Sequence, residues 1–147
     1  MRGFEKVSRV AYDEEIRLPE RSTSGSAGYD FFAPYRIEVP AKSEILVRTG
    51  IKAYMEKDEA LFVYPRSSLG IKKGLMLKNT VGIIDSDYYD NPDNEGEILC
   101  SLYNFSEKDV EIPKGAKMIQ GIFQKILLAD HDSQMKGRNG GLGSTGE

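Results

Sequence analysis

The sequence has one cysteine, one histidine and no tryptophan among its 147 residues. Because Cys100 is alone, an internal disulfide and a zinc site built from several cysteines are excluded. A Ser-His-Asp or Cys-His mechanism would have to use His131, whose neighbours Asp130 and Asp132 are more typical of a solvated polar turn. We therefore expect Cys100 to lie in the core and His131 to take no part in nucleophilic catalysis.

Long apolar runs are also missing, and no stretch approaches the length of a membrane span. The first six residues contain no apolar signal core, so we expect a cytoplasmic location without membrane association. The net charge of −3 argues against stable nucleic-acid binding but leaves room for a local cationic pocket. With 39% hydrophobic and 29% charged residues, the chain is typical of a soluble, globular, single-domain protein.

No segment of useful length shows the apolar period of a helix. Short apolar and β-branched stretches instead alternate with proline, glycine and charged turns, which predicts a nearly all-β chain folded as a sandwich, barrel or jelly roll. The expected strands cover residues 4–10, 35–39, 44–48, 51–54, 60–64, 98–103 and 118–123.

The stretch from Asn79 to Tyr88 begins at strand-like apolar density and ends in two carboxylates and a tyrosine. Gly82 would allow a positive φ or expose bare backbone, so the segment could form a tight hairpin around a small planar ligand. Asn79 and Tyr88 would then surround the ligand, and Asp85 would lie at its exit. The alternative is a buried strand that runs into a polar turn, and this stretch alone favours that alternative.

The segment from Pro65 to Gly74 places a guanidinium and two hydroxyls directly after an expected buried strand. Arg66, Ser67 and Ser68, at the start of a short helical turn, suit a phosphate oxygen that accepts charge-assisted hydrogen bonds. The glycine spacing differs from that of a Walker A loop. A basic surface turn is the alternative interpretation.

Two polar residues lie within apolar surroundings. Asp30 lies among aromatic residues, where a charge usually has a partner, so a structural brace and a site residue are equally open. Gln120 interrupts an apolar strand, and a buried amide needs hydrogen-bond partners.

The composition changes after residue 132, where the chain becomes rich in glycine and poor in apolar residues. A mobile tail is expected in solution. Arg138, Ser144 and Thr145 nevertheless suit a segment that folds over an anion, with a plain disordered terminus as the alternative.

Taken together, these features resemble the five motifs of the trimeric deoxyuridine triphosphatases (dUTPases). The motifs occur in order between residues 27 and 146, nearly the whole chain. They cover residues 27–30, residues 65–70, residues 82–88, Lys114-Gly115 with Gln120, and Arg138 with residues 140–146.

The resemblance implies a jelly-roll homotrimer with active sites at subunit interfaces. It divides the chain into a β domain, residues 1–132, and a flexible arm, residues 133–147, that closes over the nucleotide. The implied reaction is Mg²⁺-dependent hydrolysis of dUTP to dUMP and pyrophosphate, which limits uracil in DNA and supplies dUMP for dTMP synthesis. The alternatives are a dCTP deaminase of the same fold and a nucleotide-responsive regulatory protein with an unidentified partner.

The resemblance also implies a role for each matching residue. Asp85 would orient and deprotonate a water that attacks the α-phosphorus, and Asp30 would support a metal-bound water network. Phosphates and waters would hold Mg²⁺ without a dedicated protein cage. Tyr88 would pack on the deoxyribose and leave no room for a 2′-hydroxyl, and Asn79 with the following backbone would read uracil. The implied substrate-binding residues are Arg66, Ser67, Ser68, Asn79, Gly82, Ile84, Tyr88, Gln120, Arg138, Leu142, Gly143, Ser144 and Thr145.

The sequence departs from the family pattern in three places. Residues 89–95 make a longer loop than the family usually has. Ala116-Lys117 replaces an acidic residue followed by arginine, so a bidentate ion pair there should be lost or weakened. Leu142 replaces a phenylalanine that stacks on uracil, which predicts weaker closure of the arm.

Overall fold

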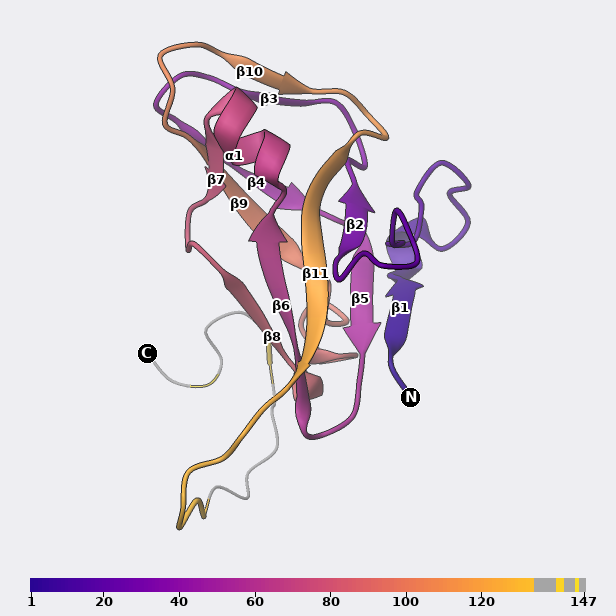
Figure 1. Ribbon diagram of the computed structural model, residues 1–147. Helices are drawn as coiled ribbons and strands as arrows, with labels where there is room; N and C mark the ends of the chain where they lie inside the picture. Colours follow the sequence, from indigo (N-terminus) through magenta and orange to yellow (C-terminus); the bar gives the residue numbers. More distant parts are fainter. Residues whose placement is uncertain (134–139, 142–144, 146–147) are drawn as a thin grey trace.

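The computed structural model describes residues 1–133, 140–141 and 145, and within them the regular secondary structure is almost entirely β-strand (Figure 1). One short helix, α1 (Ser67–Lys73), and two 3-10 turns, η1 (Ser8–Val10) and η2 (Ser86–Tyr88), interrupt the strands. No helix of this described part is long and apolar enough to cross a membrane. The strands are β1 (Gly3–Lys6), β2 (Tyr29–Phe32), β3 (Ile37–Val39), β4 (Glu44–Arg48), β5 (Ile51–Tyr54), β6 (Glu59–Pro65), β7 (Leu75–Leu77), β8 (Gly82–Asp85), β9 (Leu99–Asn104), β10 (Val110–Ile112) and β11 (Lys117–Lys125).

The strands pair antiparallel in four small sheets. The largest has the order β2-β11-β6-β8, and a second has the order β4-β9-β7. β1 pairs with β5, and β10 pairs with β3. The long β11 therefore lies between two strands that precede it by more than 50 residues, as Figure 1 shows along the centre of the molecule.

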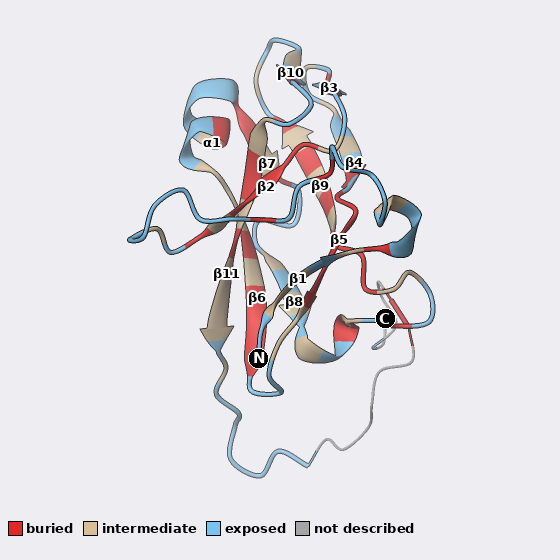
Figure 2. Ribbon diagram, turned by 90° about the vertical axis from the view of Figure 1, so that its right-hand side faces the viewer, coloured by how far each residue is buried: buried red, intermediate tan, exposed pale blue. Residues whose placement is uncertain are grey.

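Strands of all four sheets contribute buried residues to one hydrophobic core, and Figure 2 shows the buried stretches in red. Along β9 the buried residues Cys100, Leu102 and Asn104 alternate with half-buried ones. The prediction that Cys100 lies in the core is confirmed, and burial raises the pKa of its thiol to about 12. A thiol in this state is a poor nucleophile at neutral pH.

Several strands match the sequence expectation, and the first one does not. β4 and β5 have the expected limits. The expected strand over residues 4–10 is wrong in its second half, because β1 ends at Lys6 and Ser8–Val10 form η1. Val7 is buried and donates a last backbone bond to Gly50, after which the Val10 amide bonds back to the Val7 carbonyl and turns the chain.

The predicted hairpin around Gly82 is wrong. β8 pairs with β6, whereas the preceding β7 pairs with β9, so the segment joins two sheets. Gly82 lies opposite Val63, and an added Cβ would come within 3.2 Å of the Val63 Cβ. Thr80 makes the turn instead, with a φ of 67°. The alternative, a strand that runs into a polar turn, gives the correct order of elements, because β8 leads directly into η2. The strand is, however, only partly buried.

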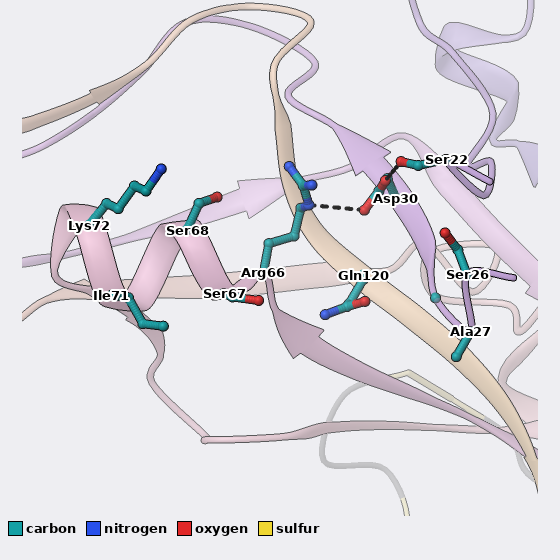
Figure 3. A pocket seen from close by; sticks show the side chains of 11 residues that line it. Ser22, Ser26, Ala27, Asp30, Arg66, Ser67, Ser68, Ile71, Lys72 and Gln120 are labelled. Atoms are coloured by element: carbon teal, nitrogen blue, oxygen red, sulfur yellow. Dashed lines mark hydrogen bonds and ion pairs between the residues drawn. The ribbon is translucent and has the colours of Figure 1, made fainter.

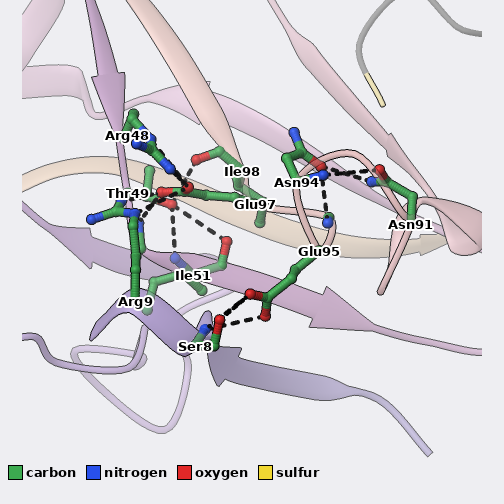
Figure 4. A network of polar contacts seen from close by, with 12 residues as sticks. Ser8, Arg9, Arg48, Thr49, Ile51, Asn91, Asn94, Glu95, Glu97 and Ile98 are labelled. Atoms are coloured by element: carbon green, nitrogen blue, oxygen red, sulfur yellow. Dashed lines mark hydrogen bonds and ion pairs between the residues drawn. The ribbon is translucent and has the colours of Figure 1, made fainter. Parts of the chain in front are cut away.

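A buried carboxylate ties three segments together on the side of the molecule drawn in Figure 4. The side chain of Glu97 is 2% exposed and contacts the guanidinium groups of Arg9 and Arg48. It also accepts the Gly50 amide at 2.9 Å. Burial raises the pKa of Glu97, but the hydrogen bonds from Arg9, Arg48 and Gly50 outweigh this and hold the pKa below the ordinary value of 4.5.

This network predicts a loss of stability in acid. Because the pKa of Glu97 is lower in the folded than in the unfolded chain, its contribution is present above about pH 4.5 and is lost as the pH falls through the folded-state pKa. Glu97→Gln should lower the free energy of unfolding at pH 7 by roughly 1.5–3 kcal/mol and flatten its decline in acid. Urea unfolding between pH 7 and pH 3 measures both effects.

Glu107→Gln is the matched control, because Glu107 is exposed and pairs only at the surface with Lys42. It should leave the acid decline unchanged. If Glu97→Gln lost stability in acid as steeply as the parent protein, another carboxylate would carry the effect.

Candidate active site

A cleft of about 550 Å³ opens where β6 passes into α1 (Figure 3). Its walls come from β2 and the loop before it, from α1 and the residue before it, and from β11. Figure 3 shows polar side chains from all three walls pointing into the same space. The lining residues are Ser22, Ser26, Ala27, Gly28, Asp30, Arg66, Ser67, Ser68, Ile71, Lys72 and Gln120.

The order of the strands explains why distant motifs meet here. Gln120 on β11 lies opposite Asp30 on β2 and opposite Tyr64 on β6. Arg66 follows the last residue of β6 and precedes α1 with extended backbone, φ −73° and ψ 151°. The strand pairing therefore brings the predicted residues Asp30, Arg66 and Gln120 together, with Ser67 and Ser68 beside them.

Asp30 is held between two cations. Its side chain is 8% exposed, and one oxygen lies 3.1 Å from Arg66 Nε. The other oxygen accepts the Ser22 hydroxyl at 2.7 Å and lies 3.4 Å from Lys117 Nζ. Both oxygens are thus engaged, so Asp30 braces the Arg66 guanidinium while it lines the cleft. Of the two interpretations left open by the sequence, the structure shows the brace, and the role of Asp30 as a site residue stays a prediction.

Lys117 is the residue at which the sequence predicts a lost or weakened ion pair. Its ammonium contacts Ser22 Oγ at 2.5 Å as well as Asp30. A charge pair is retained, but a single ammonium contact replaces the planar, bidentate pairing that a guanidinium could make. The expectation of a lost or weakened bidentate pair stays a prediction.

Gln120 is half-buried and lies directly against Gly28. Its amide donates to the Pro65 carbonyl at 3.4 Å. A Cβ added to Gly28 would lie 2.3 Å from Gln120 Oε1. The glycine therefore makes room for the amide at the cleft wall.

Asp85 and the other residues predicted on its segment do not line this cleft. Asp85 is exposed at the end of β8 and lies opposite Ala60 near the start of β6. Arg66 lies beyond the other end of β6, so strand rise alone separates the two positions by about 20 Å. A single chain cannot place both side chains on one phosphate group. Asn79, Gly82, Ile84 and Tyr88 belong to the same separate segment.

Tyr88 is buried, with 7% of its surface exposed. Its hydroxyl donates to the Glu97 carbonyl at 2.8 Å and accepts the Asn94 side-chain amide at 2.9 Å. The loop that follows therefore fixes the ring. The predicted contact with deoxyribose stays a prediction.

Four predicted residues of the arm, Arg138, Leu142, Gly143 and Ser144, lie outside the described residues. Thr145 is described and is an exposed turn residue. Sequence reasoning missed Ser22, Ser26, Ile71 and Lys72 in the cleft wall. The expectation that buried Asp30 needs partners was the signal that could have led to Ser22.

Comparison with known proteins gives a consistent result. A family model described as dUTPase matches residues 14–146. The deoxyuridine 5'-triphosphate nucleotidohydrolase of Lactococcus lactis subsp. lactis (strain IL1403) is 46% identical over 99% of this chain and 98% of its own. A crystal structure of dUTPase from Streptococcus mutans superposes with a TM-score of 0.80 at 44% identity, covering 87% of this chain and 98% of that one. A mutant dUTPase from phage phi11 of S. aureus, described as coordinating a structural Mg(II) ion, shares the fold at 16% identity, with a TM-score of 0.72 and 92% and 97% coverage.

The close approach of Gly28 and Gln120 yields a test of the cleft. Gly28→Ala must displace the Gln120 amide, so we expect affinity for a non-hydrolysable dUTP analogue to fall about tenfold, equivalent to about 1.4 kcal/mol. Gly25→Ala in the same loop is the control, because its Cβ would meet nothing within 4 Å. Calorimetric titration of both variants measures the difference. Equal affinities would show that Gln120 does not contact the ligand.

Proposed function

The chain belongs to the dUTPase family, and on this basis we propose that it hydrolyses dUTP to dUMP and pyrophosphate by attack of an Asp85-activated water on the α-phosphorus. The observation that carries this proposal is the cleft in which Arg66, Ser67, Ser68 and Gln120 converge. In the cell the reaction would limit uracil in DNA and supply dUMP for dTMP synthesis.

The cleft suits the triphosphate because it concentrates cations and hydroxyl donors. Arg66 is fixed by Asp30, and Lys72 lies on the same wall. Ser67 and Ser68 add hydroxyls at the start of α1. A triphosphate repels an attacking oxygen, so donors that are already in position lower the cost of bringing the nucleophile close.

The residues fit a Mg²⁺ that is carried by the substrate. The described residues contain no group of three His, Cys, Asp or Glu side chains that could hold a metal. Asp30 already contacts Arg66, Ser22 and Lys117, so it would act on metal-bound waters rather than as a direct ligand. Mg²⁺ commonly binds through phosphates and several waters. When bound, it would screen the negative charge of the triphosphate.

Asp85 supplies the base. Its exposed carboxylate at the end of β8 would hold one water in line with the α-phosphorus and take its proton as the new bond forms. The attacking oxygen bonds to the α-phosphorus, and pyrophosphate leaves. Tyr88 would exclude a 2′-hydroxyl sterically, and Asn79 would bond the uracil edge.

The separation of Asp85 from the cleft leads us to propose a site shared between copies in a homotrimer. Arg66 of one copy would meet Asp85 of another, because about 20 Å of strand separates them within one chain. β8 lies at the edge of its sheet and exposes Ile83, and Val81, just before the strand, is exposed as well. Exposed apolar side chains on an unpaired edge favour burial against a partner.

Asp85→Asn tests the chemical step. Loss of a general base typically costs about 10²–10⁴-fold in rate, so pyrophosphate release from dUTP should fall by roughly that factor while dUTP affinity changes little. Asp58→Asn is the control, because it removes the same charge from the same end of the sheet, where Asp58 pairs with Lys125.

Assays with dUTP, dTTP, dCTP and UTP, each with Mg²⁺ and with a chelator, give the specificity. Turnover retained in Asp85→Asn would remove Asp85 from its role. Ammonia release from dCTP would indicate a deaminase instead.

A further inference from the structure

Arg66 reaches the cleft from extended backbone just before α1, so its guanidinium needs a fixed partner to point in one direction. Asp30 is that partner, because one of its oxygens lies 3.1 Å from Arg66 Nε and its side chain is only 8% exposed. A carboxylate that is itself free to rotate could not hold the guanidinium in place. The contacts of the second Asp30 oxygen therefore decide how firmly Arg66 is positioned.

The second oxygen of Asp30 meets the charge of Lys117 mainly through a hydroxyl. Lys117 Nζ lies 3.4 Å from this oxygen, which is longer than the roughly 2.7–2.9 Å of a charge-assisted hydrogen bond. The Ser22 hydroxyl accepts from Lys117 Nζ at 2.5 Å and donates to the Asp30 oxygen at 2.7 Å. Ser22, Asp30 and Arg66 consequently form a chain of contacts, which Figure 3 marks with dashed lines.

A shift in strand register lets Lys117 reach this position. Lys117 lies opposite Phe32 on β2, and Gln120 lies opposite Asp30, with the shift just after Lys117. Residues three apart on a regular strand point to opposite faces of a sheet. Because of the shift, Lys117 and Gln120 both lie opposite residues of the face that carries Asp30. Such irregularities commonly redirect a side chain beside an active site.

The loop before β2 brings Ser22 to the same place. Glu20 exchanges two backbone hydrogen bonds with Asp30, at 2.8 and 3.2 Å, so the chain is anchored two residues before Ser22. The guanidinium of Arg21 donates to two backbone carbonyls further along the loop, at 2.8 and 3.2 Å, and closes the loop on itself. The hydroxyl of Ser22 is thus held beside Asp30, although the residue is exposed.

We propose that Ser22 and Lys117 are positioning residues for Arg66. The Ser22 hydroxyl links the Lys117 ammonium to Asp30, and Asp30, held in this way, directs the guanidinium toward the substrate phosphates. The inference deepens the proposed function, because it rests on Arg66 being a phosphate-binding residue.

The chemistry of the two cations explains why a hydroxyl is needed beside a lysine. An ammonium is a compact point charge, whereas a guanidinium presents several N–H donors in one plane and can bond a carboxylate with two of them. Lys117 ends 3.4 Å from Asp30, and the bridging hydroxyl supplies the shorter hydrogen bond. An arginine at position 117 could bond Asp30 directly, so we expect Ser22 to be dispensable in Lys117→Arg.

The first test reads the Arg66 guanidinium and needs no catalysis. In protein labelled with ¹⁵N-arginine, with the signal assigned through Arg66→Lys, Ser22→Ala should speed exchange of the Arg66 Nε–H with water about tenfold. Ser22→Thr keeps the hydroxyl and should retain slow exchange. Ser24→Ala is the control, because Ser24 meets Arg21 through its backbone carbonyl, which the substitution keeps. An exchange rate that Ser22→Ala leaves unchanged would overturn the role of Ser22, whatever the protein hydrolyses.

The second test asks whether Ser22 acts through Lys117 and Asp30. With Lys117 in place, Ser22→Ala should lower kcat/KM for dUTP about tenfold, with Tm little changed. In the Lys117→Arg background, the same substitution should lower kcat/KM by no more than about twofold, because residues of one hydrogen-bond network act non-additively.

Two outcomes of the second test would overturn the positioning role. One is an unchanged kcat/KM in Ser22→Ala. The other is an equal loss in both backgrounds, which would mean that Ser22 contacts the ligand directly and does not act through Asp30. Absence of dUTP turnover in the parent protein would instead refute the proposed function, and the exchange measurement would then decide the role of Ser22 alone.

Discussion

The site depends first on the position of β11 between β2 and β6. This pairing places Gln120 opposite Asp30 on one side and Tyr64 on the other. The next residue, Gly121, is so tightly enclosed that a Cβ would lie 3.0 Å from Leu61 Cδ1. Register slippage by one residue would turn Gln120 away from the cleft. The late strand β11 therefore determines whether the earlier motifs meet.

Two buried carboxylates are each paired with cations, but the two sets of ion pairs have different roles. Asp30 lies in the cleft and fixes Arg66, so a structural ion pair also orients a group that lines the cleft. Glu97 lies outside the cleft and joins Arg9 and Arg48 across the N-terminal segment and the sheet. Neither carboxylate could be buried without these cations, because the desolvation of a lone charge is too costly.

Much of this arrangement could be predicted from the sequence, and the failures have physical causes. Strands with clear boundaries, such as β4 and β5, were predictable from turn residues and apolar runs. Three-residue strands such as β7 are too short to show a recognisable alternation of apolar and polar residues. The hairpin at Gly82 failed because close packing on Val63, not a positive φ, accounts for the glycine. The separation of Asp85 from Arg66 depends on which strand pairs with β8, which local pattern does not specify.

The central claim is that the site is complete only when Arg66 of one copy meets Asp85 of another. The most direct test mixes Arg66→Ala and Asp85→Asn chains, each inactive alone, by co-refolding in equal amounts. Random assembly of a symmetric oligomer would place an intact Arg66 beside an intact Asp85 in about one quarter of the sites, so about one quarter of the parent activity should return. No recovery, with normal assembly of the mixed oligomer, would contradict the shared site and require both residues to act within one chain.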